Sequence, residues 1–352
     1  MRWYDFLLYP FALLYDLVTS LRNIFFDLGW KKSQKSKIPS IVVGNLSVGG
    51  TGKTPMVEFL IAKLKSDFKV AVLSRGYGRK TKGFLTANSQ ATPSKIGDEP
   101  FQIFRKFKNE IEVFVGEDRL AAIEKISSRE ETPEVLILDD AFQHRYILGD
   151  FIIVLTTYQK PFCSDFLLPM GRLRESRKGA KRGDVVIVTK SPEILSDHDK
   201  SELLQKINRY IRPKTPVIFS SISYGVPFPL RGNPVFSPKI ILLTGLADDG
   251  PLVEYVSQEF QLLTTLSYPD HYDYSLSDFE KIKSVFRSFL PVHPVILTTE
   301  KDAVKVKSNA PEGFLQEIPI FVLPIVVSMS LTDEAILDRL IQQKVFNRDQ
   351  HK

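Results

Sequence analysis

The chain has 352 residues, of which 43% are hydrophobic, and this length suits one large domain or two modest domains with their own cores. The formal net charge of +6 suits an anionic partner such as a nucleotide, a phosphorylated substrate or an acidic membrane surface, and is too small to indicate nucleic acid by itself. Neither zinc-finger spacing nor an RNA-binding aromatic signature is present, and no feature indicates an obligate protein partner. Because Cys163 is the single cysteine, an intramolecular disulfide is excluded.

The first thirty residues are mostly apolar and aromatic. Asp5 and Asp16 interrupt the apolar run and no small-residue cleavage site follows, so the segment is a poor signal peptide and a poor transmembrane span. Because proline suits the first turn of a helix, we expect a helix from about Pro10 to Leu28. Its polar residues fall within an arc of about 100°, except Arg22, which stands apart, and the wide apolar remainder must be buried in something.

A basic run follows this helix, with lysines at 31, 32, 35 and 37. A wide apolar face next to lysines suits a helix that lies in an anionic membrane interface. The alternative is a terminal helix packed on the protein core, followed by a solvated linker.

The stretch VGNLSVGGTGKTP indicates a phosphate-binding loop, although Ser47 replaces the first glycine of the usual G-x-x-x-x-G-K-[ST] pattern. An apolar strand, 41–43, precedes it and a helical pattern, 56–64, follows. We expect Lys53 to reach the β- and γ-phosphates and Thr54 to hold Mg²⁺. The predicted nucleotide-binding residues are Ser47, Val48, Gly49, Gly50, Thr51, Gly52, Lys53 and Thr54.

A metal-anchoring acid is expected at a neighbouring strand end. Residues 135–138 read as a buried parallel strand that ends in Asp139 and Asp140, which can hold Mg²⁺ or its water. Further strands at 68–74, 151–157 and 184–190 alternate with helical segments. The pattern predicts an α/β fold of the P-loop NTPase type, with a parallel sheet sandwiched by helices.

The loop alone does not choose between a kinase, a GTPase switch, a ligase and a motor. Thr189 and Lys190 resemble the start of a GTPase base-reading motif, but Pro192 stands where its aspartate should be, so ATP is favoured.

Other candidate site residues lie at predicted strand or helix ends. Arg75, Tyr77 and Arg79 form either a clamp for an anion or a basic surface turn. Asp98 and Glu99 precede or begin a helix, where acidic residues also serve as caps. His271 stands between Asp270 and Tyr272, and a lone histidine there would usually be structural.

Together these motifs resemble the tetraacyldisaccharide 4′-kinase family of lipid A assembly. The resemblance rests on VGNLSVGGTGKTP, SRGYGR, GDEP, DDAFQHR, LPMGRLRE, YPDHYDYS and TTEKDAVK, in the family's order between Ile41 and Lys305. One departure is Ala141, which replaces a glycine expected after the aspartate pair and matters only if that backbone needs a positive φ.

The resemblance implies ATP- and Mg²⁺-dependent phosphorylation of the 4′-hydroxyl of an acylated glucosamine disaccharide 1-phosphate, at the cytoplasmic face of the bacterial inner membrane. It implies a membrane-interface helix and basic linker (1–36), a P-loop ATP-binding domain (37–225) and a smaller C-terminal α/β domain (226–352), whose final segment can return to the first domain. The rivals are a membrane-associated regulatory ATPase or GTPase that binds a protein partner, and a kinase for another amphiphile. Acceptor-dependent ADP release discriminates between them.

The resemblance also implies roles for single residues. Asp98 becomes the general base for the sugar hydroxyl, supported by His271 across a domain cleft. Glu99, Asp139 and Asp140 become unranked ligands of the metal or its water, and Lys301 and Asp302 match without a role. The residues expected to line the substrate or nucleotide are Arg75, Tyr77, Arg79, Gln143, His144, Arg174 and Glu175.

Overall fold

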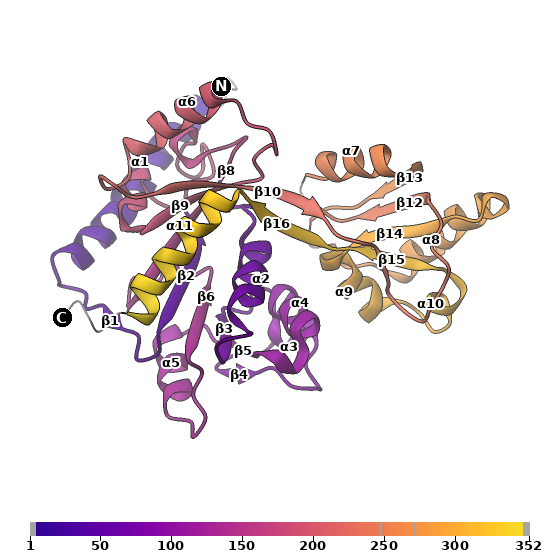
Figure 1. The fold of residues 1–352 in the computed structure, drawn as a ribbon, viewed down its shortest axis with the longest axis horizontal. Helices are drawn as coiled ribbons and strands as arrows, with labels where there is room; N and C mark the ends of the chain where they lie inside the picture. Colours follow the sequence, from indigo (N-terminus) through magenta and orange to yellow (C-terminus); the bar gives the residue numbers. More distant parts are fainter. Residues whose placement is uncertain (1–4, 247, 271, 348–352) are drawn as a thin grey trace.

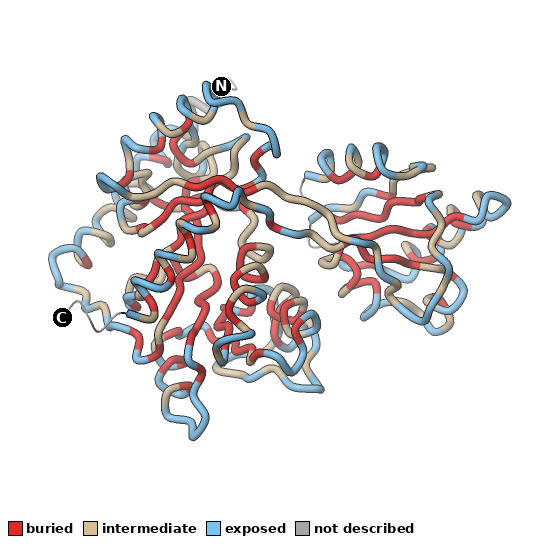
Figure 2. Tube along the Cα trace, in the orientation of Figure 1, coloured by how far each residue is buried: buried red, intermediate tan, exposed pale blue. Residues whose placement is uncertain are grey.

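The structure is a computed structural model that describes residues 5–246, 248–270 and 272–347. Two sheets with their own helices form a larger and a smaller body, joined by strands β10 and β16 (Figure 1). The predicted α/β fold, with a largely parallel sheet, a smaller second sheet and an N-terminal helix, is confirmed. Buried residues run along the strands of both sheets (Figure 2).

The larger sheet has nine strands within the described residues, in the order β16-β10-β9-β8-β2-β6-β3-β5-β4. Its neighbours pair in parallel except β4 with β5 and β10 with β16, as expected for buried Val- and Ile-rich runs joined by helices. The strands are β2 (Ser40–Asn45), β3 (Val70–Ser74), β4 (Leu85–Thr86), β5 (Glu112–Val115), β6 (Val135–Asp139), β8 (Phe151–Thr157), β9 (Val185–Thr189), β10 (Val217–Tyr224) and β16 (Ile325–Met329). A separate short pair joins β1 (Gln34–Lys35) and β7 (Ile147–Leu148).

Helices cover both faces of this sheet. One core joins the sheet to α2, α4 and α11 and includes Val327, Leu337 and Ile341 near the chain's end. The end of the chain therefore packs against the first sheet after passing through the second. The helices of this body are α1 (Asp5–Asp27), α2 (Lys53–Leu64), α3 (Pro93–Ile96), α4 (Asp98–Phe107), α5 (Arg119–Ser127), α6 (Asp197–Asn208) and α11 (Leu331–Ile341).

Helix α1 starts five residues earlier than we expected, so the predicted start at Pro10 is wrong. Pro10 lies inside the helix, where it removes one backbone hydrogen bond close to the N-terminal end. A helix of 23 residues retains enough other hydrogen bonds to tolerate that loss. No helix in the described ranges is long and apolar enough to cross a membrane.

The smaller sheet has five strands in the described part of the chain, in the order β11-β15-β14-β12-β13. Helix α7 lies on one face and α8, α9 and α10 on the other (Figure 1). The elements are β11 (Phe228–Pro229), β12 (Lys239–Thr244), β13 (Gln261–Ser267), β14 (Val295–Thr299), β15 (Ile320–Leu323), α7 (Gly250–Glu259), α8 (Leu276–Ser288), α9 (Glu300–Asn309) and α10 (Phe314–Glu317).

The two bodies are joined by a paired ribbon. Tyr224 on β10 pairs with Ile325 on β16, the Gly225 amide donates to the Pro324 carbonyl at 2.9 Å, and β11 continues antiparallel to β15. The same two chain segments thus stay hydrogen-bonded from one sheet into the other.

Candidate active site

The carboxyl ends of the parallel strands meet at one edge of the larger sheet, where α/β proteins bind ligands. Strand β2 ends at Asn45 before the glycine-rich loop, β6 ends at Asp139, and β9 ends at Thr189. The topology therefore brings the predicted loop and the predicted acids to one place.

The glycine-rich loop is shaped by Asn45, whose Nδ2 donates to Thr51 Oγ1 at 2.6 Å. Gly49 and Gly52 have φ values of 102° and 82°, which side chains other than glycine rarely adopt. Helix α2 begins at Lys53, so its first-turn N–H groups have no acceptor within the helix and favour an anion in front of them.

Strand β9 supports the same loop from the side. Thr189 Oγ1 donates to the Thr51 carbonyl at 2.9 Å. The next residue, Lys190, has its Nζ 3.9 Å from the position that a Cβ on Gly50 would take. Burial lowers the pKa of Lys190, against the opposing effect of Asp248. Sequence reasoning used this lysine only to judge the GTPase hypothesis and missed its place beside the loop.

Two of the predicted nucleotide-binding residues also contact the segment 171–174. Ser47 forms a β-bridge with Leu173, and the Val48 amide donates to the Arg172 carbonyl at 2.7 Å. The Val48 amide is thus engaged within the protein.

Asp139 and Asp140 have different environments although they are adjacent. Asp139 is 1% exposed and accepts from Ser74 Oγ at 3.1 Å. Burial, with the nearby carboxylates of Glu99 and Asp140, raises the pKa of Asp139 to about 7. Burial would also raise the pKa of Asp140, but Lys53 and a bidentate contact with Arg174, at 2.9 and 3.2 Å, lower it.

This acidic edge fits Mg²⁺. Asp139 Oδ1 is buried and has no hydrogen-bond partner in the structure, and the carboxylate of Glu99 lies near enough to raise its pKa. A divalent cation would satisfy the oxygen and reduce the repulsion. No group of three or more His, Cys, Asp or Glu side chains in the described ranges forms a complete metal site. Mg²⁺ commonly uses one or two carboxylates together with water and substrate phosphates, so this finding is consistent with the fit.

The turn before Asp98 needs glycine. Gly97 has a φ of 94°, and a Cβ there would lie 2.9 Å from the Tyr77 carbonyl. The turn sets the N-terminus of α4 beside the loop that follows β3, and the helix dipole favours Asp98 and Glu99 in its first turn.

The structure places a lysine against Asp98. Lys305 on α9, in the smaller body, has its Nζ 3.3 Å from Asp98 Oδ2. His271, the predicted partner of Asp98, lies outside the described residues. Its neighbours are held by the same helix, because Lys301 forms an ion pair with Asp270 and Lys305 donates to the Tyr272 carbonyl at 3.1 Å.

The cluster after β3 separates into exposed and buried members. Arg75 is exposed, and Tyr77 is 80% exposed. The Arg79 side chain is buried and forms an ion pair with Glu117 at 2.6 Å, while also donating to the Gly83 carbonyl. These contacts of Arg79 hold its own loop, and its role toward an anion stays a prediction.

Gln143 and Glu175 form the seat of helix α1. Glu175 is 3% exposed and accepts from Gln143 at 3.1 Å, from Asn23 on α1 at 3.0 Å and from Arg182 at 2.7 and 2.8 Å. Arg22 on α1 donates to the Gln143 carbonyl at 2.8 Å. The acceptor capacity of Glu175 is thus used within the protein.

Two basic groups lie near the acidic edge, the half-buried His144 and the buried Arg119. Burial and the charge of Arg119 lower the pKa of His144, and burial lowers the pKa of Arg119 to about 10 despite Asp139. Sequence reasoning missed Arg119. The available signal was its position just after β5, at the same edge as the other strand ends.

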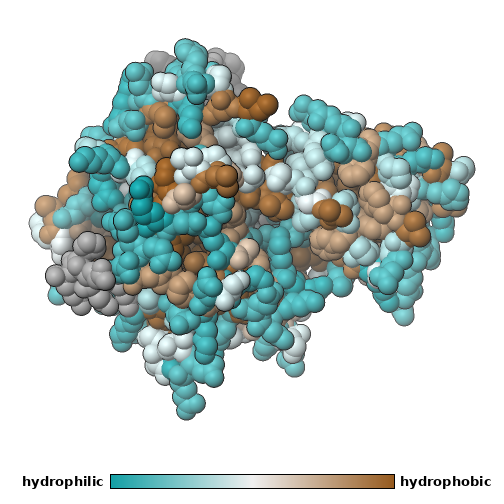
Figure 3. All heavy atoms as spheres, in the orientation of Figure 1, coloured by the Kyte–Doolittle hydropathy of each residue, from teal (hydrophilic) through white to brown (hydrophobic). Residues whose placement is uncertain are grey.

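Helix α1 contacts the protein through its polar side and turns its apolar side outward. Asn23 and Arg22 contact the seat described above, and Asp27 pairs with Arg145 at 2.6 Å. The large hydrophobic residues at least 44% exposed on or just after α1 are Leu7, Tyr9, Phe11, Leu13, Leu14, Leu17, Val18, Leu21, Ile24, Leu28 and Trp30. The face drawn in Figure 3, by contrast, shows hydrophobic residues in small groups among hydrophilic ones. The row on α1 is therefore an unusually large exposed apolar surface.

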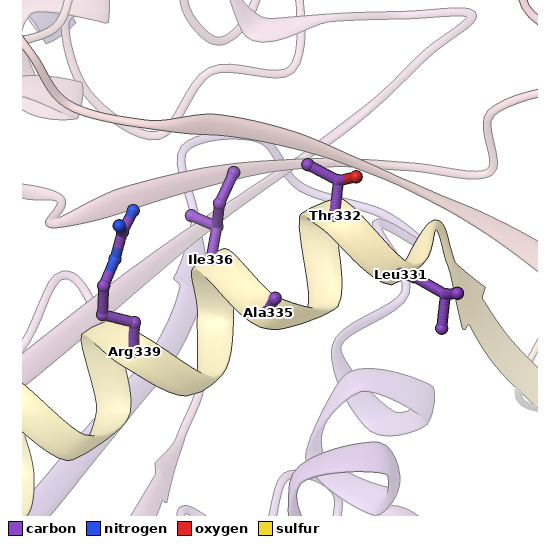
Figure 4. Close-up of a pocket in the computed structure, with 5 residues that line it drawn as sticks. All are labelled: Leu331, Thr332, Ala335, Ile336 and Arg339. Atoms are coloured by element: carbon purple, nitrogen blue, oxygen red, sulfur yellow. The ribbon is translucent and has the colours of Figure 1, made fainter.

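Two hollows of about 420 Å³ each lie outside the phosphate-loop edge. One lies between the apolar side of α1 and the Leu168–Pro169 turn. The other is lined by Leu331, Thr332, Ala335, Ile336 and Arg339, all on α11 (Figure 4). None of the predicted site residues lines either hollow.

A glycine-rich loop between a strand and a helix, beside strand-end acids, defines a P-loop nucleotide-binding protein. A model of the family "Tetraacyldisaccharide-1-P 4'-kinase" matches residues 4–345. A protein named tetraacyldisaccharide 4′-kinase in Flavobacterium psychrophilum is 40% identical to this chain, and the alignment covers 95% of both chains. A protein of the same name in Cytophaga hutchinsonii is 39% identical, and the alignment covers 97% of this chain and 96% of the relative.

A crystal structure from Aquifex aeolicus, described as LpxK in complex with ATP, has a TM-score of 0.75 and 30% identity, covering 97% of this chain and 99% of the other. The chain belongs to the tetraacyldisaccharide 4′-kinase family, as the sequence motifs indicated. The activity of that family is ATP-dependent 4′-phosphorylation of tetraacyldisaccharide 1-phosphate in lipid A synthesis.

Proposed function

We propose that the chain transfers the γ-phosphoryl group of ATP to the 4′-hydroxyl of tetraacyldisaccharide 1-phosphate by in-line displacement, with Asp98 as the general base. The observation that carries this proposal is the convergence of the phosphate loop, the acidic edge and the N-terminus of α4. The Glu99 carboxylate, next to Asp98, affects the pKa of Asp139, so the proposed base and the proposed phosphate site are close.

The residues have distinct tasks in this proposal. Lys53 and the first turn of α2 bind the phosphates and stabilise charge on the transferring group. Thr54, Asp139, Asp140 and Glu99 are the candidate ligands of Mg²⁺ or its water, and the ion when bound would neutralise phosphate charge. The Asp98 carboxylate accepts the proton of the sugar hydroxyl as the bond to phosphorus forms.

We propose that α1 lies in the anionic interface of the cytoplasmic face of the bacterial inner membrane. Its exposed apolar side supports this, and the lysines at 31, 32, 35 and 37 add attraction to acidic lipids. The acylated substrate would then enter the site from the bilayer surface. We further propose that the two sheets are separate domains that close on the substrate and exclude water.

The test of the base is a cycle of four proteins: wild type, Asp98→Ala, His271→Ala and the double variant. At saturating ATP and lipid acceptor, Asp98→Ala should lower kcat by about 10²–10⁴-fold, and the double variant should be scarcely slower because the residues act as a unit. ATP affinity is the control and should not change. Additive losses would show independent roles, and ADP release without dependence on the acceptor would contradict the kinase proposal.

A further inference from the structure

The TTEKDAVK segment contains a buried lysine to which the sequence assigned no role. Lys305 is 5% exposed, and lysines are almost never fully buried unless they are paired. Its Nζ lies 3.3 Å from Asp98 Oδ2, 3.1 Å from the Tyr272 carbonyl and 3.4 Å from Asp273 Oδ1. The Asp273 side chain is 87% exposed, so water weakens that pair, whereas the Asp98 side chain is 25% exposed. Of these two carboxylates, Asp98 is therefore the one that interacts more strongly with Lys305.

The helix that carries Lys305 is fixed to the smaller sheet. Thr299 caps α9 by accepting from the Asp302 amide at 3.1 Å. The Asp302 carboxylate, 3% exposed, accepts from the Gly245 amide at 3.0 Å, just after β12. Asp302 thus has a structural task, which is to join the first turn of α9 to the end of a central strand. One helical turn later, Lys305 is presented from a rigid support.

A second contact fixes α9 along α4. Lys106, two turns after Asp98, lies 2.8 Å from Glu300 at the start of α9. The two helices therefore run antiparallel, with Asp98 next to Lys305 and Lys106 next to Glu300. In one pair the acid is on α4 and the lysine on α9, and in the other pair this is reversed. A shift of one helix that exchanged the partners would therefore bring like charges together.

We propose that Lys305 is a positioning residue for phosphoryl transfer, which acts from the smaller body by orienting the Asp98 carboxylate. The inference rests on the proposed role of Asp98 as the base. During the reaction the sugar hydroxyl gives its proton to Asp98 and its oxygen bonds to the γ-phosphorus, while the bond from that phosphorus to the bridging oxygen breaks and ADP leaves. Lys305 only holds the Asp98 carboxylate in place. The base is thus complete only when both bodies are in contact.

The test compares Lys305→Met with Lys307→Met, which removes an exposed lysine from the same helix. Because a hydrogen bond to a charged group is worth more than a neutral one, Lys305→Met should lower kcat by about 10- to 100-fold. The KM for ATP should stay unchanged because the phosphate loop is intact. Lys305→Arg should recover part of the loss, and Lys307→Met should behave as wild type. Melting curves check folding, and Lys305→Gln, which keeps a donor without the charge, replaces the Met variant if that one does not fold.

The decisive measurement adds Asp98→Asn and the double variant Asp98→Asn/Lys305→Met. If Lys305 acts through Asp98, its removal should cost little once the carboxylate is gone. The inference would be overturned if Lys305→Met lowered kcat equally in the wild-type and Asp98→Asn backgrounds, or if folded Lys305→Met had wild-type kcat. In either case a slow Asp98→Asn variant would still support Asp98 as the base. Wild-type kcat in Asp98→Asn would instead overturn the proposed base, and with it the inference.

Discussion

Lys106 lies between two carboxylates that belong to different parts of the protein, and its removal should destabilise the fold in a pH-dependent way. It is 2.6 Å from Glu58 on α2 and 2.8 Å from Glu300 on α9. Glu58 is 5% exposed, and burial, followed by repulsion from Glu300, raises its pKa despite Lys106. We consider the substitution Lys106→Met, which keeps the length of the side chain and removes its charge.

The expected magnitude follows from burial. Removing one partner of a buried ion pair costs about 3–5 kcal/mol, but the Lys106 side chain is 30% exposed, so we expect about 2–3 kcal/mol at pH 8. At roughly 2–4 °C per kcal/mol, the melting temperature should fall by about 4–12 °C.

The raised pKa of Glu58 means that the folded state binds its proton more tightly than the unfolded state. Stability therefore falls as the pH rises from the ordinary value of 4.5 through the raised folded value, and the variant should lose less at pH 5.5 than at pH 8.

Thermal unfolding of wild type, Lys106→Met, Glu58→Gln and the double variant at both pH values measures this effect. Glu58→Gln should restore much of the stability of Lys106→Met at pH 8, because it removes the carboxylate left unpaired. A loss that is equal at both pH values, or a double variant no more stable than Lys106→Met, would refute the reasoning.

Three further outcomes are expected. Lys53→Ala should lower turnover by at least about 10²-fold with little change in melting, and near-normal turnover would remove the phosphate-loop assignment. Replacing Leu14, Leu17 and Val18 by serine should weaken flotation with anionic vesicles without lowering the melting temperature, because these side chains are exposed; unchanged flotation would assign membrane binding to another surface. Asp139→Asn should abolish most turnover and should raise the melting temperature at pH 8 but not at pH 4. The reason is that the pKa of Asp139, about 7 in the folded state, makes its ionised carboxylate a cost to folding at high pH. A lower melting temperature at pH 8 would contradict this.

The sequence was informative where a function depends on neighbours along the chain. The glycine-rich loop and the Asp139–Asp140 pair each sit within one strand and one turn, so composition and spacing predict their place. The left-handed residue of that turn is Asp140, with a φ of 47°, so Ala141 is no obstacle where a glycine was expected.

The sequence was less informative where a side chain has partners distant in the chain. Lys305 meets Asp98 only because the two sheets pack α9 against α4, and no local pattern encodes that contact. The ion pair of Arg79 with Glu117 likewise joins residues that are distant in the chain, and no local pattern indicates it. The periodicity of α1 separated its polar and apolar sides, but only the fold reveals that the polar side faces the protein.

The paired ribbon has a consequence for how the chain folds. In topological terms the smaller sheet is an insertion into a β-hairpin, since Tyr224 and Ile325 pair directly although about a hundred residues separate them. Closing a flexible loop of that length costs about 4 kcal/mol of chain entropy. If the inserted sheet folds first, β11 and β15 already hold the two ends together, and most of that cost is met before β16 docks. In that order the last strand of the larger sheet and α11 dock after the insertion has folded, with their two chain ends already held together.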